Sequence, residues 1–266
     1  MSIAEKLTTI AENEQKVYDA GFKAGKSQGG GGDAEAAFEA GKKAQYDEFW
    51  DNFQNNGNLK NYKSVFAGRG WKQEVFYPKY DIIATNAVGT FQEFGGTSFN
   101  LVQRLEECGV TLDVSNATLV GNLFMGTPFT EVPHIDTKNA TSLGSLYQNS
   151  QYLTKASIAL KDDGSQTWQN SFSSCKSLVD FTITSGAIGQ NGFNIKDSTK
   201  LSKASILSIL NACNIDVIGK GISITLPSKC IDGATDTEAL MSENGDVDLY
   251  GAKMVAYTYG YNIVFA

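Results

Sequence analysis

The chain reads Phe172-Ser173-Ser174-Cys175-Lys176-Ser177-Leu178-Val179-Asp180-Phe181-Thr182-Ile183 in the clearest copy of a unit that recurs along its middle. Apolar or small residues stand at offsets 0, 3, 6, 9 and 11 from Phe172. A copy that starts at Tyr147 places Ser150, Leu153, Ala156 and Ile158 at the same offsets. An earlier copy starts at Phe124 and, with a one-residue slip in its middle, continues through Thr127, Phe129, Val132 and Ile135. A faint fourth copy runs through Leu101, Val110 and Leu112.

The starts of the three clear copies are 23 and 25 residues apart. Leucine-rich repeats have periods of roughly 20 to 29 residues, and stacked copies bury one continuous core. The apolar alternation that closes each copy predicts a short strand, and successive strands would pair in parallel. We therefore expect an α/β fold, a short leucine-rich-repeat solenoid over residues 86–198, with an extended surface suited to binding.

Composition narrows the class of protein. The 266 residues include 41% hydrophobic and 19% charged residues, with a net charge of −7 and a pI near 4.8. Nucleic-acid binding needs a basic stripe, and none is visible, so we expect no nucleic-acid partner. No apolar stretch reaches the roughly 18 residues that would span a bilayer, so we expect no membrane insertion. The N-terminus lacks the basic and apolar regions of a signal peptide, which predicts synthesis and folding in a cytoplasm.

The four cysteines, Cys108, Cys175, Cys213 and Cys230, form no CxxC pair, and the chain has one histidine. This spacing fits no zinc site, and we expect neither a metal nor a cofactor. Cys175 stands at a core position of its repeat, where a small thiol packs well. We interpret all four as reduced, structural cysteines.

The N-terminal part reads as two helices around a joint. Residues 2–26 carry a stripe with the spacing of about two heptads; its apolar members are Ile3, Leu7, Ile10 and Val17. Either this helix packs on its own domain, or it is an oligomeric tether, trimeric where it joins a fibre. Gly29–Gly32 form a flexible joint. Residues 33–54 predict a second helix with an aromatic face that caps the first repeat.

The remaining boundaries follow from local patterns. Residues 58–85 read as a connector. After the repeats, a helix over 199–216 begins at the N-cap Ser202, a strand over 222–226 ends at Pro227, and the tail finishes with an apolar strand. The predicted organisation is a tether over 1–28, a linker over 29–33, an N-terminal cap and connector over 34–85, repeats over 86–198 and an α+β cap over 199–266.

Several segments resemble a known family. They are Glu39 through Gly57 with Tyr46-Asp47-Glu48-Phe49-Trp50 at its centre, Ala67-Gly68-Arg69-Gly70-Trp71, and Phe76-Tyr77-Pro78-Lys79-Tyr80-Asp81-Ile82. Each is similar to the early part of proteins of bacteriophages and prophages of gut bacteria that carry BspA-type leucine-rich repeats. The Phe-x-x-Cys-x-x-Leu core of that family matches Phe172, Cys175 and Leu178, and its closing helix resembles Leu201 through Asn211.

The resemblance implies a structural protein of the virion tail, such as a tail fibre or receptor-binding component. Its implied partners are other tail or baseplate proteins through the N-terminal helix and a host surface protein or glycan, with a homotrimer as the fibre form. The alternative is a bacterial cell-surface adhesion or protein-interaction module, and a less favoured one is a cell-wall or capsule depolymerase.

Catalytic patterns are weak. His134 stands between Pro133 and Ile135 with no nucleophile motif nearby, which favours a structural histidine over a catalytic one. Paired acids that could hydrolyse glycans are Glu106-Glu107, Asp162-Asp163, and Asp236 with Glu238. The stretch from Glu243 to Asp248 is acidic but lacks an EF-hand spacing, so we interpret it as a turn. We expect no enzyme.

The candidate ligand-binding residues are polar or aromatic residues of the repeats. Aromatic rings stack on sugars, and neighbouring amides hydrogen-bond to them. Tyr147 stands at a core offset and is expected to be buried. The candidates are Trp168, Tyr152, Gln151, Gln169 and Asn170.

Overall fold

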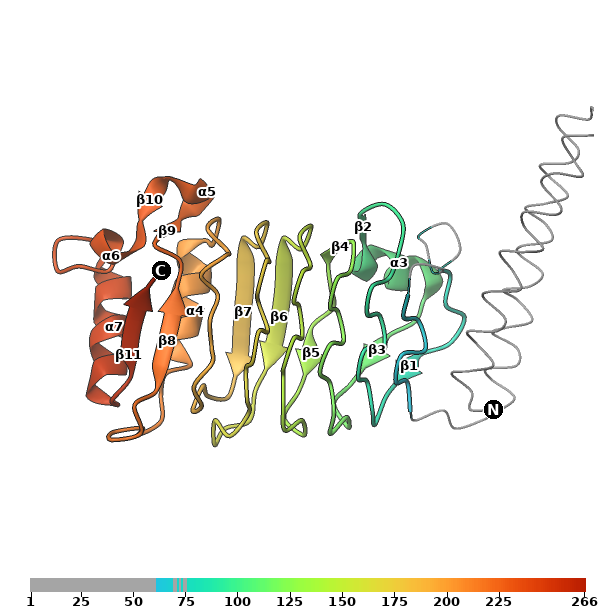
Figure 1. The fold of residues 1–266 in the computed structure, drawn as a ribbon, viewed down its shortest axis with the longest axis horizontal. Helices are drawn as coiled ribbons and strands as arrows, with labels where there is room; N and C mark the ends of the chain where they lie inside the picture. Colours follow the sequence, from blue (N-terminus) through green and yellow to red (C-terminus); the bar gives the residue numbers. More distant parts are fainter. Residues whose placement is uncertain (1–60, 69–70, 72, 74–75) are drawn as a thin grey trace, which may run out of the picture.

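The computed structural model describes residues 61–266, apart from 69–70, 72 and 74–75. Short strands follow one another along its long axis, with α3 near one end and α4 and α7 near the other (Figure 1). The elements are β1 (Ile82–Ile83), β2 (Phe99–Asn100), α3 (Leu101–Cys108), β3 (Leu112–Asp113), β4 (Phe129–Glu131), β5 (Ile135–Asp136), β6 (Lys155–Ala159), β7 (Asp180–Ser185), α4 (Lys203–Asn211), β8 (Ser223–Leu226), β9 (Lys229–Cys230), α5 (Ile231–Ala234), β10 (Thr235–Asp236), α6 (Thr237–Leu240), α7 (Val247–Thr258) and β11 (Asn262–Phe265).

The largest sheet has the order β2-β4-β6-β5, with β7 paired to β6, and all its pairs are parallel. The pairs β1–β3 and β8–β11 are also parallel, and β9–β10 is antiparallel. This is the mixed α/β class with parallel strands that the sequence predicts. The helices predicted over 2–26 and 33–54 and the glycine joint between them lie outside the described residues.

A tight turn recurs on the side of the stack away from these strands. We call it the aromatic turn: five residues with an aromatic ring at the centre and a left-handed residue at each end. The first residues, with φ between 55° and 59°, are Ser64, Gly89, Asn122, Ser145 and Asn170. The last residues, also at positive φ, are Gly68, Glu93, Gly126, Asn149 and Ser174. The central aromatic residues are Phe66, Phe91, Phe124, Tyr147 and Phe172.

Each aromatic turn is tied to the next through backbone and rings. The amide of Phe124 donates to the carbonyl of Leu146 over 2.9 Å, and the amide of Tyr147 donates to that of Ser171 over 2.9 Å. The stacked ring pairs follow in order along the chain: Phe66–Phe91 at 5.4 Å, Phe91–Phe124 at 5.8 Å, Phe124–Tyr147 at 5.7 Å and Tyr147–Phe172 at 5.7 Å. All five central rings are buried, so they form one continuous ladder through the core.

The ladder begins earlier than the sequence patterns indicate. Asn61 bridges Asn86 in parallel, and Phe66 is the first ring of the ladder. The described part of the predicted connector over 58–85 therefore belongs to the stack, and its boundary at residue 86 is corrected. The faint copy at Leu101 is also wrong, because Leu101 begins helix α3. That helix lengthens the segment between Phe91 and Phe124.

The slip in the copy that starts at Phe124 is confirmed as a change of register. Glu131 faces Lys155, 24 residues later, whereas Ile135 faces Ile158, 23 residues later. The one extra residue lies between β4 and β5, where Pro133 offers no amide hydrogen to a ladder. The bulge leaves His134 exposed at the surface.

Helix α4 closes the free edge of β7. The amides of Phe181 and Ile183 donate to the hydroxyl oxygens of Ser205 and Ser208, each over 2.8 Å. The Ser205 hydroxyl also donates to the carbonyl of Val179 over 3.0 Å. An unpaired strand edge is a template for association, and here helix side chains occupy it. The predicted N-cap Ser202 is confirmed, since its side chain accepts from the Ser205 amide.

Beyond α4, β8 and β11 pair in parallel, and α7 packs against α4. The predicted strand over 222–226 and the apolar final strand are confirmed as β8 and β11. The Tyr261 hydroxyl donates to the Ile188 carbonyl over 2.6 Å inside the core, which fixes this end to the stack. All four cysteines are free. Within the described ranges, no helix has both the length and the apolar character needed to cross a bilayer.

Candidate functional site

The outer sheet face is the most regular exposed surface of the stack. We define it by the side chains of β4, β6 and β7 that alternate with core residues, together with the bulge histidine. Its members are Glu131, His134, Lys155, Ser157, Asp180, Thr182 and Thr184. Successive strand side chains point to opposite sides of a sheet, so Ala156, Ile158 and Phe181 face the core instead.

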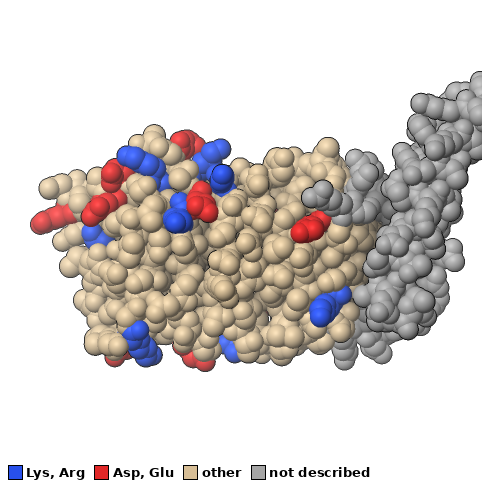
Figure 2. Space-filling view, viewed as in Figure 1, with Lys and Arg blue, Asp and Glu red and all other residues tan. Residues whose placement is uncertain are grey.

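Alternating charges cross this face in register. Glu131 faces Lys155 on β6, and Lys155 faces Asp180 on β7. Opposite charges directly across neighbouring strands favour this register over its alternatives. Charged side chains are few over the middle of the face in Figure 2, and they gather mainly above α4 to α6. The middle of the stack thus offers a broad, weakly charged surface.

The structure brings His134 and Ser157 together on this face. The His134 Nδ1 atom lies 3.1 Å from the Ser157 Oγ atom, and both belong to neighbouring segments of the stack. A nucleophile and a base at this distance form part of a catalytic triad, which also needs a group that orients the base. Within the described residues, no carboxylate is hydrogen-bonded to His134. The pair therefore acts here as a link across the bulge.

The prediction that Trp168 lies on the outer surface is wrong. Its side chain is 1% exposed, and its ring contacts Phe172 at 6.0 Å and Phe193 at 4.9 Å. A ring enclosed in this way cannot offer its face to a ligand. Trp168 instead extends the aromatic ladder toward the C-terminal end of the stack. Tyr147 is buried, as expected.

The other predicted ligand residues are exposed but lie in turns. Tyr152 is 56% exposed, with Gln151 beside it in the segment before β6, while Gln169 and Asn170 precede the ring of Phe172. Among the described contacts, none joins Tyr152 to Gln169 or Asn170. They remain available to a ligand without forming a single cluster with the outer sheet face. The predicted oligomerisation residues Ile3, Leu7, Ile10 and Val17 lie outside the described residues.

The candidate acid pairs are engaged locally. Glu107 binds Arg104, with 3.3 Å between Oε2 and Nε. Asp163 accepts from the Ser165 amide, and this bond holds the pKa of the Asp163 carboxyl below its ordinary value. The Ala239 amide does the same for the pKa of Asp236, the N-cap of α6. A general acid of a glycosidase needs a raised pKa, the opposite direction.

The acidic stretch from Glu243 to Asp248 is a capping turn. Asp246 is the N-cap of α7 and accepts from the amides of Asp248 and Leu249. Its other oxygen lies 2.9 Å from Lys203 Nζ on α4. The Lys203 hydrogen bond, together with those of the two amides, holds the pKa of Asp246 below its ordinary value. Among the described residues, no group of three or more acidic, histidine or cysteine side chains could hold a metal ion.

A groove lies between the end of β7 and α4, with a volume of about 380 Å³. It is lined by Ile183, Thr184, Ser185, Gly186, Ala204, Leu207, Ser208, Asn211, Ala212 and Asn214. Sequence patterns do not reveal this groove, because its walls come from a strand and a helix whose pairing is tertiary. The charge row of the outer sheet face could have been found, since Glu131, Lys155 and Asp180 follow the repeat spacing.

Comparisons of the chain with protein-family models, with curated proteins and with solved structures found no match.

Proposed function

We propose that this chain is a non-enzymatic structural protein of a phage or prophage tail, a tail fibre or receptor-binding component. In this proposal the parallel stack is a short leucine-rich-repeat solenoid that presents its surface to a host-cell ligand, and residues 1–28 join the protein to other tail proteins. The resemblance of the segments around Tyr46 to Trp50 and around Trp71 to phage-associated proteins motivates it.

The observation that carries the proposal is the ladder of aromatic turns. Five turns of the same backbone shape follow one another, each hydrogen-bonded to the next and each contributing one ring to the core. A unit of this kind buries its apolar edge only against its neighbours, which is the physical basis of a solenoid. A stack with a rigid core and a regular outer face suits a protein that displays a surface.

The location of the protein tests the proposal directly. Particles induced from a lysogen that carries the gene would be purified by density gradient and analysed by mass spectrometry. We expect peptides of this chain in the particle fraction, and labelled antibodies at the tail in electron micrographs. Peptides confined to the cell-wall fraction would overturn the tail assignment in favour of the surface-adhesion alternative. Release of reducing sugars from host envelopes by the purified chain would favour the depolymerase.

The N-terminal tether is tested by the mass of the full chain in solution. Light scattering is expected to give a trimer, and Leu7→Asp with Ile10→Asp is expected to give a monomer, because charges in an a/d seam prevent association. Thr8→Asp, outside the stripe, serves as the matched control. A trimer that survives the double substitution would place the contact elsewhere. The exposed apolar side chains of α7, such as Val247 at 79% and Val255 at 52% exposure, would then be the first surface to alter.

A further inference from the structure

The groove between β7 and α4 exists because a helix stands where the next strand of the stack would pair. Ser205 and Ser208 bind the edge of β7 at Phe181 and Ile183. Just beyond Ile183 the register between β6 and β7 shifts. Gly186 then turns the chain at φ 85°, so close to the Leu160 carbonyl that a side chain there would clash. The strand and the helix therefore separate at this point, and the groove opens between them.

The lining of the groove has an apolar floor and a polar rim. Leu207 and Ile183 are half-buried, and Ala212 is buried. Asn211 and Asn214 are exposed on the rim. Within the described residues, neither of their carboxamides is engaged in a side-chain hydrogen bond. Each carboxamide offers two donors and one acceptor oxygen, so the rim can exchange hydrogen bonds with a ligand that carries both kinds of group.

None of the lining residues is ionisable. A charged ligand would lose hydration on entering the groove without meeting an opposite charge, which is costly. A neutral ligand with several hydroxyl groups avoids this cost. Its hydroxyls can pair with the carboxamides and with Ser185, while its C–H surface covers the apolar floor. Ligand pockets commonly measure about 300 to 1,000 Å³, so a volume of about 380 Å³ holds one or two sugar rings.

We propose that this groove binds a neutral hexose or N-acetylhexosamine unit, with Asn211 and Asn214 as its hydrogen-bonding residues. The inference deepens the proposed function, on which it rests for the source of the sugar, the end of a host-surface glycan. A free monosaccharide has the same chemistry and would occupy the same groove. Because a single sugar is a small ligand, we expect a dissociation constant in the millimolar range.

The test uses the full chain and ligand-observed NMR titrations with the methyl glycosides of glucose, galactose, mannose, N-acetylglucosamine and N-acetylgalactosamine. Glucuronic acid serves as the charged comparison. We expect saturable binding of at least one neutral glycoside and none of the acid. Asn211→Ala and Asn214→Ala should each weaken binding about threefold to tenfold, as the loss of one hydrogen bond does. Asn116→Ala, another exposed asparagine, should leave binding unchanged.

Blocking the groove gives the decisive variant. Ala204→Trp fills the space beside α4 and is expected to abolish binding, while Ala234→Trp at another exposed alanine is not. Thermal unfolding of both variants checks that the fold is kept. The assignment is overturned if no neutral glycoside binds, if Ala204→Trp binds normally while folded, or if neutral peptides bind and sugars do not. Binding of a purified host polysaccharide, with none of its free sugars, would identify the glycan as the source.

The two proposals fail separately. Tail particles that contain the chain while the groove binds no sugar would leave the tail function standing and remove the sugar site. Sugar binding by a chain found only in the cell wall would do the reverse.

Discussion

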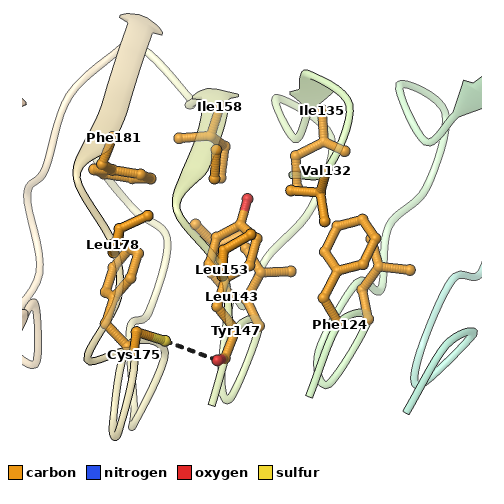
Figure 3. Close-up of a cluster of buried hydrophobic side chains, with 14 of the residues drawn as sticks. Phe124, Val132, Ile135, Leu143, Tyr147, Leu153, Ile158, Cys175, Leu178 and Phe181 are labelled. Carbon is orange, nitrogen blue, oxygen red and sulfur yellow. Dashed lines mark hydrogen bonds between the residues drawn. The ribbon is translucent and has the colours of Figure 1, made fainter. Parts of the chain in front are cut away.

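The Cys175 Sγ atom donates a hydrogen bond to the carbonyl oxygen of Tyr147, 28 residues earlier, over 2.9 Å (Figure 3). The Ser150 hydroxyl holds the same place one turn earlier and donates to the Phe124 carbonyl over 2.6 Å. Each donor follows the ring of its own aromatic turn by three residues. The third position of the repeat thus requires a small hydrogen-bond donor that links two neighbouring turns, and small size alone does not satisfy it.

Substitution of Cys175 separates these two requirements. Cys175→Ser keeps a donor of similar size, and we expect nearly unchanged stability. Cys175→Ala leaves the buried Tyr147 carbonyl without this donor and should lower the free energy of unfolding by about 1 to 3 kcal/mol. Urea unfolding measures both. Cys108→Ala, at a less buried thiol, is the control, and equal stability of the Ala and Ser variants would contradict the role of the bond.

Tyr147 carries a buried hydroxyl that has no hydrogen-bond partner. In Figure 3 its ring lies among apolar side chains of neighbouring strands, and the rings before and after it in the ladder are phenylalanines. Tyr147→Phe removes an unsatisfied polar group, so we expect a gain of about 1 to 2 kcal/mol in the free energy of unfolding. Tyr152→Phe, at an exposed tyrosine, should change little. A loss of stability in Tyr147→Phe would show that the hydroxyl has a partner in solution.

The edge of β7 depends on two hydroxyls of α4. We expect Ser205→Ala and Ser208→Ala each to lower the free energy of unfolding by about 1 to 3 kcal/mol, because a strand amide loses its acceptor. The double variant should also associate at high concentration, since the strand edge is then open. Chemical unfolding and light scattering measure these effects, with Lys200→Ala as the control on an exposed residue outside α4. A monomeric double variant of unchanged stability would refute the edge role.

Alkaline pH should destabilise the fold through two buried thiols. Burial raises the pKa of Cys175 and of Cys213 from 9.0 to about 12. Below pH 9 both thiols are protonated in the folded and unfolded states, so they add no pH dependence. Between pH 9 and 12 only the unfolded chain releases these protons, and stability should fall by up to about 1.4 kcal/mol per pH unit for each thiol.

The thiol contribution is isolated by comparison of slopes. Urea unfolding from pH 8 to pH 11 would be measured for the natural chain and for the double variant Cys175→Ser with Cys213→Ala. We expect a shallower decline in the variant, whatever its stability at pH 8. Equal slopes would mean that the two thiols titrate alike in both states.

The aromatic turns place non-glycine residues in the left-handed region. Ser145 has φ 55°, which costs an L-residue about 1 kcal/mol, and Gly89 holds the equivalent position two turns earlier. Ser145→Gly should therefore leave stability unchanged or raise it by up to about 1 kcal/mol, while Ser145→Val should lower it, since a β-branched residue is strained at positive φ. Thermal unfolding compares the two, with Ser165→Val as control. A Val variant as stable as the Gly variant would contradict the turn geometry.

Local patterns were sufficient where neighbours in sequence carry the information. The alternation around Ile158 and Ile183 predicts the strands, the spacing of Phe124, Tyr147 and Phe172 predicts that they pair in parallel, and Ser202 marks the start of α4. These features depend on side-chain periodicity and capping, which a single sequence displays. The same spacing extends back to Phe91 and Phe66, so the early turns were also within reach.

Tertiary structure decided the rest. The exposure of Trp168 depends on Phe193, which packs on it from the next segment, and polar neighbours in sequence such as Gln169 gave the wrong side. The pairing of His134 with Ser157 depends on a bulge between distant segments. The groove beside Ile183 exists because α4 replaces a strand. Contacts between segments far apart in the chain bury or expose a side chain, whereas local sequence sets only the direction in which it points along its own strand or helix.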